Sequence, residues 1–252
     1  MQGYSRTPEG YLSWQHLLFV TSLILLMAVS AVVLGRKNRG KCVREKNRVL
    51  IVAAILIDAF ELLKIILHCV ASKEADRWLY ELPLFLCSIQ LIALPLAAFS
   101  KGKIKEASLD FVFIFGLLGA LLGTYGAGQN YNAYPVLSFD NVVSGITHAI
   151  SGFSALYIVI SGMQSMKKRN ILPTALILLG FCVVAYVVNV LIDYNYMFLM
   201  RDDGTPYQIV YSLVKGNEVL YPLCVAGLFF VYIFGFYLTY FAIGKTKSKV
   251  AM

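Results

Sequence analysis

The chain has 252 residues, of which 59% are hydrophobic and only 14% are charged, and its mean hydropathy is +0.71. Soluble domains carry about 25% charged residues, so this composition excludes an ordinary soluble protein and indicates an integral membrane protein. The formal net charge of +8 does not indicate a nucleic-acid partner, because the basic residues cluster in short segments between apolar runs, where they set membrane orientation.

Seven apolar runs approach the length that a membrane-spanning helix requires, which is about 20 residues. The sequence therefore predicts an all-α, polytopic integral membrane protein with seven transmembrane helices in a single domain over residues 1–252. The first segment lacks the basic start of a cleavable signal, so we expect the first run to be retained as a helix. The runs are residues 14–34, 49–71, 79–99, 109–125, 141–163, 171–194 and 219–243.

The segments between the runs alternate in charge. Lysine and arginine are concentrated at 35–48, 101–105 and 167–169 and in the tail at 245–249, whereas the segment at 126–140 has no basic residue. Because basic segments remain on the cytoplasmic side, this alternation predicts the N-terminus outside and the C-terminus inside, in a multi-pass protein of the cell membrane. The first basic segment has a second interpretation, contact with anionic lipid.

Cysteine spacing gives no sign of a metal site or a disulfide framework, and we expect no cofactor. Most of the cysteines fall in or at the ends of apolar runs, where an unreactive buried thiol is the ordinary interpretation. The five cysteines are Cys42, Cys69, Cys87, Cys182 and Cys224.

The stretch LPLFLCSIQ, residues 82–90, carries Cys87, Ser88 and Gln90 into the first half of the third run. Polar groups at membrane depth are costly unless they have partners, which makes them candidates for function. If the third run is helical from residue 79, Cys87 lies about 12 Å from its outer end. His148 lies seven residues into the fifth run, at about 10 Å.

A thiol and an imidazole at one depth are what a cysteine nucleophile with a histidine base requires, because the base raises the fraction of reactive thiolate. Each residue also has a structural interpretation. Cys87 alone resembles a small buried apolar residue, and His148 alone resembles a hydrogen-bonded packing residue.

Further polar residues recur at helical spacing and predict a polar interior. Gln90 is one turn from Cys87, and the pair formed by Glu61 and Lys64 has the simpler interpretation of an ion pair within one helix. We predict that four helices present these residues toward one outward-opening cavity. The helical faces are Asp58, Glu61, Lys64 and His68 on the second run, Asn141, Ser144, His148 and Ser151 on the fifth, and Asn189, Asp193 and Tyr196 on the sixth.

Three motifs resemble a known family. LPLFLC at 82–87, Thr147-His148 followed by Leu156-Tyr157, and Asn195-Tyr196-Met197-Phe198-Leu199 look like the bacterial YwaF-like integral membrane proteins. That group is similar to eukaryotic transmembrane protein 164, an acyltransferase that acts on phospholipid acyl chains, and more distantly to membrane lipid hydrolases of the androgen-induced-gene type. The resemblance covers residues 79–240, and the Asn-Tyr-Met-Phe-Leu stretch is its most specific part.

The resemblance implies Cys87 as the acyl-accepting nucleophile, His148 as its base, and Asn195 and Tyr196 as residues that line or cap the site. Two departures stand out, because Phe85 occupies a position where bacterial relatives commonly have histidine, and residues 200–206 replace a common lysine-proline. The expected partners are membrane phospholipids or another lipid. The predicted substrate-binding residues are Glu61, Lys64, Ser88, Gln90, Ser144, Asn189, Asp193, Asn195 and Tyr196.

Three functions remain open from the sequence. The first is a lipid acyltransferase or lipid hydrolase that works through an acyl-cysteine. The second is a transporter or channel with a proton or ion relay along the second helix, from Asp58 to His68. The third is a seven-helix receptor or lipid-binding module, although the last run contains no lysine for a retinal Schiff base.

Overall fold

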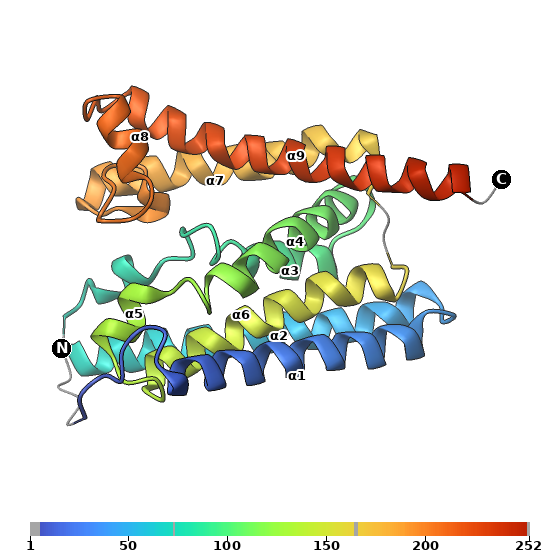
Figure 1. Ribbon diagram of the computed structural model, residues 1–252, viewed down its shortest axis with the longest axis horizontal. Coiled ribbons are helices and arrows are strands. Elements are labelled where there is room, and N and C mark those ends of the chain that lie inside the picture. Colours follow the sequence, from blue (N-terminus) through green and yellow to red (C-terminus); the bar gives the residue numbers. More distant parts are fainter. Residues whose placement is uncertain (1–5, 73, 164–165, 251–252) are drawn as a thin grey trace. The chain divides into compact units, whose positions relative to one another are not determined.

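The computed structural model describes residues 6–72, 74–163 and 166–250. Over these residues nine α-helices and three short 3-10 helices make up the regular secondary structure (Figure 1), which confirms the predicted all-α fold. The chain divides into two compact units, Met1–Ser165 and Met166–Met252. The single domain that we expect over residues 1–252 stays a prediction.

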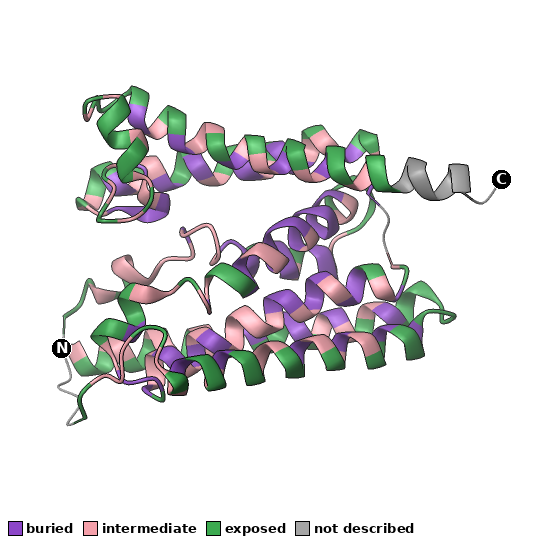
Figure 2. Ribbon diagram, in the orientation of Figure 1, coloured by how far each residue is buried: buried purple, intermediate pink, exposed green. Residues whose placement is uncertain are grey.

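The first unit is built around α6, which packs against α4, α1 and α2, while α4 also packs against α3. Buried residues are concentrated on α4 and on one side of α6 (Figure 2). The helices are α1 (Trp14–Asn38), α2 (Val43–Ser72), α3 (Gln90–Phe99), α4 (Gly102–Leu122), α5 (Gly128–Ala133) and α6 (Phe139–Ile160), with the 3-10 helix η1 (Arg77–Glu81) after α2.

The second unit is a pair of long helices joined by a folded connection. The Thr174 hydroxyl lies 3.0 Å from the Tyr237 hydroxyl and joins the two long helices inside the unit. Its elements are η2 (Lys168–Asn170), α7 (Ile171–Ile192), η3 (Tyr196–Phe198), α8 (Gln208–Leu213) and α9 (Leu220–Val250).

The prediction of one continuous helix over residues 79–99 is wrong. Helix α3 begins only at Gln90, and residues 82–89 form an extended and turn segment between η1 and α3. Leu82 has φ −62° and ψ 147°, the extended conformation that a residue before proline prefers, and Pro83 itself has no N–H for a helical hydrogen bond. The other six runs each coincide with a helix.

Four helices of the described chain are long and apolar enough to cross a membrane, so the protein is a multi-pass membrane protein. They cover Trp14–Asn38, Phe139–Ile160, Lys168–Ile192 and Leu220–Ile243. Helix α2 is long, but Asp58, Glu61 and Lys64 interrupt its apolar sequence. Helix α3 has 10 residues and reaches about 15 Å, half of the hydrocarbon thickness.

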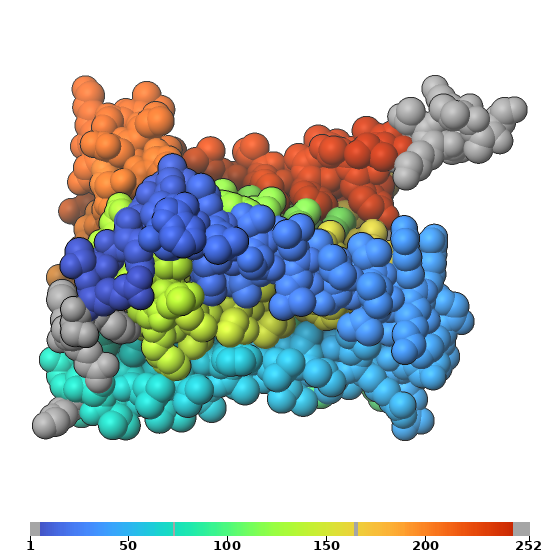
Figure 3. Space-filling view, turned by 60° about the horizontal axis from the view of Figure 1, so that its bottom comes forward, coloured from blue at the N-terminus to red at the C-terminus, as the bar shows by residue number. Residues whose placement is uncertain are grey.

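The long helices of the first unit have apolar exteriors and polar groups inside. On α1, Leu25 and Leu26 are 60% and 65% exposed, whereas His16 is fully buried and its Nε2 atom lies 3.3 Å from the Thr124 carbonyl oxygen. Figure 3 shows the face that α1 and α2 cover, with α6 visible between them. Large exposed apolar surfaces of this kind suit contact with lipid.

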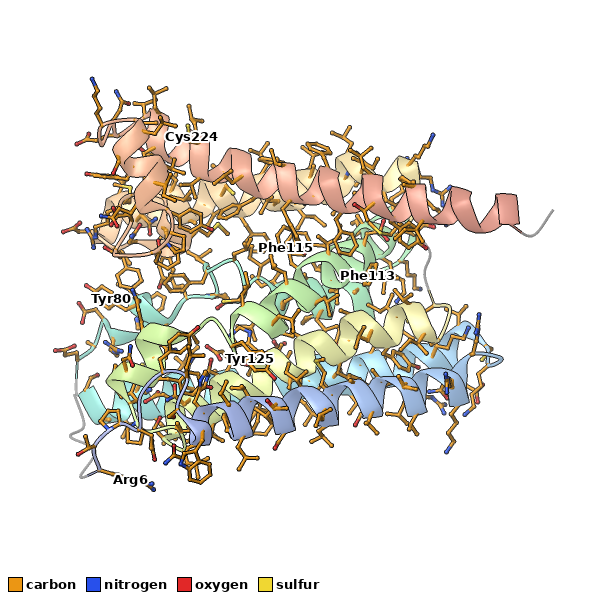
Figure 4. All side chains as sticks on the ribbon, in the orientation of Figure 1. Arg6, Tyr80, Phe113, Phe115, Tyr125 and Cys224 are labelled. Carbon is orange, nitrogen blue, oxygen red and sulfur yellow. The ribbon has the colours of Figure 1, made fainter. Side chains whose placement is uncertain are left out.

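The segment before α1 is fastened to the residues between α4 and α6. The Tyr11 hydroxyl donates to the carbonyl of Tyr125, which is labelled in Figure 4, at 2.7 Å. The Tyr125 hydroxyl in turn lies 2.8 Å from that of Thr21. Glu9 accepts a hydrogen bond of 2.8 Å from the Val136 N–H. These bonds fix one end of the first unit.

Candidate functional site

Hydrogen bonds between helices set the register of α2, α3 and α6. Near one end of the unit, His68 Nε2 lies 2.5 Å from Asp140 Oδ1, which aligns the end of α2 with the start of α6. Near the other end, Asn47 donates to the Ala98 carbonyl at 2.7 Å, which aligns the start of α2 with the end of α3. Helix α2 therefore runs antiparallel to both of its neighbours, and positions along the three helices can be compared by counting residues.

Cys87 and His148 approach the same point on α4. A methyl group added to Gly119 would lie 3.8 Å from Cys87 Cβ and 3.8 Å from His148 Nδ1, so these two atoms are at most twice that distance apart. The ring of His148 also lies against Gly123, where an added Cβ would come within 2.2 Å of its Cε1 atom. Gly119 of α4 and Gly123, directly after α4, thus leave space for the imidazole and for the segment that carries the thiol.

The depth of Cys87 in the membrane cannot be obtained by counting residues along a helix. Cys87 lies in the turn before α3, so a depth of eight helical residues does not apply to it. The third-segment cysteine reaches His148 because residues 82–89 fold back toward α4. Among the described residues no hydrogen bond joins the thiol to the imidazole, and Ser88 follows Cys87 directly in the chain.

Lys64 contributes a positive charge beside both residues. Its ammonium interacts electrostatically with the Cys87 thiol and with the His148 ring. Lys64 Nζ also lies 2.5 Å from Glu61 Oε1, and the two side chains are only 17% and 13% exposed. The ion pair within one helix, which the sequence left as an alternative, is therefore present, and it is partly buried.

The remaining predicted residues of the first unit lie close to this group in the sequence. Gln90 is the first residue of α3, is 1% exposed, and neither atom of its amide has a hydrogen-bond partner in the described chain. Ser144 is half-buried on α6, four residues before His148, and its carbonyl accepts a 3.0 Å hydrogen bond from the Thr147 hydroxyl.

A second polar group, which the sequence did not predict as a unit, surrounds His68. Its Nδ1 atom lies 2.8 Å from Glu81 Oε1, and Arg77 Nη2 donates to the same oxygen at 2.9 Å. Carboxylates only accept hydrogen bonds, so a ring that faces Glu81 and Asp140 with both nitrogens donates from both and carries a positive charge. Glu81 and Asp140 lie near the ends of apolar runs. Carboxylates at such positions were the sequence signal for partners of His68, and this signal was missed.

The predicted site residues of the second unit form a compact network. The amide of Asn189 accepts from the Tyr196 N–H at 2.6 Å and donates to the Tyr196 carbonyl at 3.0 Å. Asn195 accepts from the Met200 N–H at 2.9 Å and donates to the Arg201 carbonyl at 2.7 Å. Both amides and the fully buried Tyr196 therefore hold the connection between α7 and α8 in shape.

Backbone strain in this connection falls on the motif that carries the resemblance. Met197 and Phe198 both have φ 56°, in the left-handed region that side-chain-bearing residues rarely adopt. Asp193, which ends α7, has φ 50° and a side chain that is 97% exposed, 3.6 Å from Arg201 Nη1. Such strain persists only where surrounding contacts impose it, and here the two asparagine amides do so.

A comparison with protein families decides the relationship. The model of the TMEM164 family matches residues 11–243. The chain belongs to the TMEM164 family. No curated protein and no solved structure matches the chain.

The TMEM164 match extends the resemblance that the sequence motifs indicated. It begins at residue 11, before α1, rather than at residue 79, and it covers both compact units. Cys87, His148 and the Asn-Tyr-Met-Phe-Leu connection all lie inside it. Membership therefore applies to the whole helical architecture, whereas the roles of Cys87 and His148 remain predictions.

Metal binding receives no support from the part of the chain that the structure describes. Within it, no group of three or more His, Cys, Asp or Glu side chains is arranged to hold a metal ion. Cys224, labelled in Figure 4, and Cys42 are exposed and Cys182 is buried, so the cysteines occupy separate environments. The exposed and the buried cysteines can therefore serve as controls in experiments on Cys87.

Proposed function

We propose that this protein is a membrane-embedded lipid acyltransferase or lipid hydrolase in which Cys87 is the nucleophile and His148 its base. The observation that supports this most directly is the approach of both side chains to Gly119, at 3.8 Å each from a methyl group placed there. Loose spacing of a nucleophile and its base is common before a substrate binds. Membership of the TMEM164 family supports the same activity through the acyltransferases that the motifs resemble.

The proposed chemistry begins with transfer of the Cys87 thiol proton to the His148 imidazole. The sulfur attacks the carbonyl carbon of a lipid ester, the C–O bond breaks, and the proton passes from His148 to the leaving oxygen. The product of this step is an acyl thioester on Cys87. The positive charge of Lys64 would stabilise negative charge on the sulfur, and Ser88, the next residue in the chain, would line the site beside Cys87.

The proposed substrate is a phospholipid that enters from the outer leaflet. Seven membrane crossings, with the N-terminus outside and the C-terminus inside the cell membrane, would bring Cys87 and His148 into the outer half of the bilayer. Lys64 and Glu61 would then bind the charged head group, and Ser144 would line the path on α6. Substrate binding by Asn189, Asp193, Asn195 and Tyr196 stays a prediction from the sequence, and the proposed reaction needs no soluble cofactor.

The test is covalent labelling of purified protein in micelles with a lipid-like acyl electrophile. Wild-type protein should be labelled at one site, and both Cys87→Ala and His148→Ala should abolish the label. Cys224→Ala serves as the matched control, because this thiol is exposed and lies on α9. Labelling that persists in a folded Cys87→Ala protein, or that disappears with Cys224→Ala, would contradict the proposal.

A second candidate is an ion or proton pathway along α2, and the burial of its polar face favours it. Glu61 and Lys64 are at most 17% exposed, and His68 bridges two carboxylates at the end of the same face. In proteoliposomes a transporter would keep its activity in Cys87→Ala and lose it in Glu61→Gln. An enzyme would lose its acyl-transfer activity in Cys87→Ala.

A further inference from the structure

Four polar side chains of the first unit have buried atoms that lack hydrogen-bond partners within the described residues. One is Ser108 on α4, eleven residues from Gly119, and the other three belong to the helices that follow or carry Cys87, His148 and Glu61. These three are Asp58 at Oδ1, Gln90 at both amide atoms and Ser151 at Oγ. Gln90 and Ser151 are only 1% and 2% exposed. Buried polar groups nearly always have partners, so unpaired groups that gather in one place require an explanation.

Each of these residues lies three positions from a residue of the candidate site. Side chains three residues apart on a helix share a face, so Asp58 shares a side of α2 with Glu61 and Ser151 shares a side of α6 with His148. For Gln90 the relation is direct, because its N–H donates to the Cys87 carbonyl at 3.4 Å. The pairs are Asp58 with Glu61, Gln90 with Cys87, and Ser151 with His148.

The three groups also lie at one level of the first unit. Counted from the bond between His68 and Asp140, Asp58 is ten residues and Ser151 eleven residues away, which is about 15–16 Å along each helix. Counted from the bond between Asn47 and Ala98, Asp58 and Gln90 lie about 16 Å and 12 Å away. The differences are within one helical turn, so the three groups lie at similar heights along α2, α3 and α6, and Ser151 lies further than His148 from the His68 end.

We propose that Asp58, Gln90 and Ser151 bind the hydroxyl group that accepts the acyl chain from Cys87. A hydroxyl both donates and accepts, which matches a carboxylate that accepts and an amide and a serine that do both. This inference rests on the proposed function, and it concerns the second half of that reaction. The hydroxyl belongs either to water, which gives hydrolysis, or to the glycerol of a lysophospholipid, which gives acyl transfer.

The step is a substitution at the thioester carbonyl. The acceptor oxygen forms a C–O bond, the bond between the carbonyl carbon and the Cys87 sulfur breaks, and the hydroxyl proton passes to His148 and then to the sulfur. Cys87 returns to a thiol, and the products are a carboxylic acid with water or a phospholipid with a lysophospholipid. The three residues hold and orient the acceptor, so they should affect this step and not formation of the thioester.

The experiment separates the two halves of the reaction. Full-length protein in micelles is mixed with a p-nitrophenyl acyl ester, and the burst of nitrophenol measures formation of the thioester. Mass spectrometry of the intact protein then follows loss of the acyl group, once in buffer alone and once with lysophosphatidylcholine added. Wild type, Gln90→Met and Ser151→Ala are compared.

Ser108→Ala is the matched control, because Ser108 is an equally buried serine without a partner, eleven residues from Gly119 on α4. Replacing a buried unpaired polar side chain by an apolar one does not destabilise the fold, so all three variants should remain folded. If Gln90→Met fails to fold, Ser151→Ala still tests the proposal, because it removes only one oxygen atom.

We expect loss of the acyl group, relative to the burst of the same variant, to be about tenfold slower in Gln90→Met and in Ser151→Ala, the usual effect of one lost hydrogen bond to a reacting group. In Ser108→Ala this ratio should equal that of the wild type. Slowing in buffer assigns the site to water, and slowing only with lysophosphatidylcholine assigns it to the lipid hydroxyl. Loss at the wild-type rate in both variants overturns the inference and leaves the proposed function intact. A wild-type protein that acquires no acyl group on Cys87 overturns both.

Discussion

Buried amide side chains behave differently in the two units of this protein. In the second unit Asn189 uses both amide atoms to hold the backbone of Tyr196, and Asn195 holds the residues that follow. In the first unit the amide of Gln90 is as deeply buried and makes no hydrogen bond within the described chain. The amide group thus stabilises the fold in the second unit, whereas in the first unit the amide of Gln90 forms no hydrogen bond within the described chain.

This difference separates residues that build the fold from residues that we propose bind the acyl acceptor. A buried amide that is fully bonded stabilises its surroundings, whereas one without partners costs stability and is retained when something outside the fold uses it. The amides of Asn189 and Gln90 can therefore be compared directly. Removing the amide of Asn189 should lower the free energy of unfolding, and removing that of Gln90 should not.

The largest effect is expected for Asn189→Leu. The substitution leaves the Tyr196 N–H without its 2.6 Å acceptor inside the second unit, in a connection whose strained residues depend on it. We expect the free energy of unfolding in micelles to fall by about 3 kcal/mol, the sum of a lost hydrogen bond and a buried unpaired donor. Denaturant titration measures it, and a change below the error of the titration would contradict the structural role of Asn189.

A smaller effect is expected for Gly123→Ala. The new Cβ would fall within 2.5 Å of the His148 ring and force it away, at a cost of about 1–3 kcal/mol for overpacking. The acyl label on Cys87 should weaken as well, because the base moves. Gly227→Ala on α9 is the control, since nothing lies within 4 Å of the added atom, and there stability should hold or rise. Equal effects of the two substitutions would contradict the packing around His148.

The change expected for Gln90→Met is smaller still and has the opposite sign. Removing an unpaired buried amide at similar volume should leave the free energy of unfolding unchanged or raise it by about 1 kcal/mol. The same titration as for Asn189→Leu measures it. A loss as large as that of Asn189→Leu would mean that Gln90 has a structural partner, and the comparison between the two amides would fail.

The sequence predicted the helices well where hydrophobicity alone decides the structure. The helical class, the family and six of the seven helical runs follow from apolar run length and from motifs. The prediction of a helix failed at residues 82–89. Pro83 disfavours a helix there, and a count of apolar residues does not take proline into account. The depth argument for Cys87 therefore had the wrong basis, although the structure brings Cys87 toward His148 by another route.

Interactions across helices were beyond the reach of sequence reasoning. The sequence placed His68 on one polar face of the second run, but it did not indicate the two carboxylate partners, which come from η1 and from the start of α6. The unpaired state of Gln90 and Ser151 is likewise a property of the packed unit, since it depends on what their neighbours do not offer. Spacing within one helix predicts shared faces, and it contains no information on which faces meet.

The smallest effect is expected at Glu9, whose carboxylate accepts a backbone hydrogen bond, whereas Asp58 Oδ1 has no partner within the described residues. The hydrogen bond from the Val136 N–H is the main reason why the pKa of Glu9 lies below its ordinary value of 4.5. The folded state therefore binds its proton less readily than the unfolded state, so the stabilisation is present above pH 4.5 and is lost as the pH falls through the folded pKa. The chemical shift of the Val136 amide should titrate with a midpoint below pH 4.5, and Glu9→Gln should abolish that titration. A midpoint at or above the ordinary value would mean that the bond is absent in solution, and that the segment before α1 is held by Tyr11 alone.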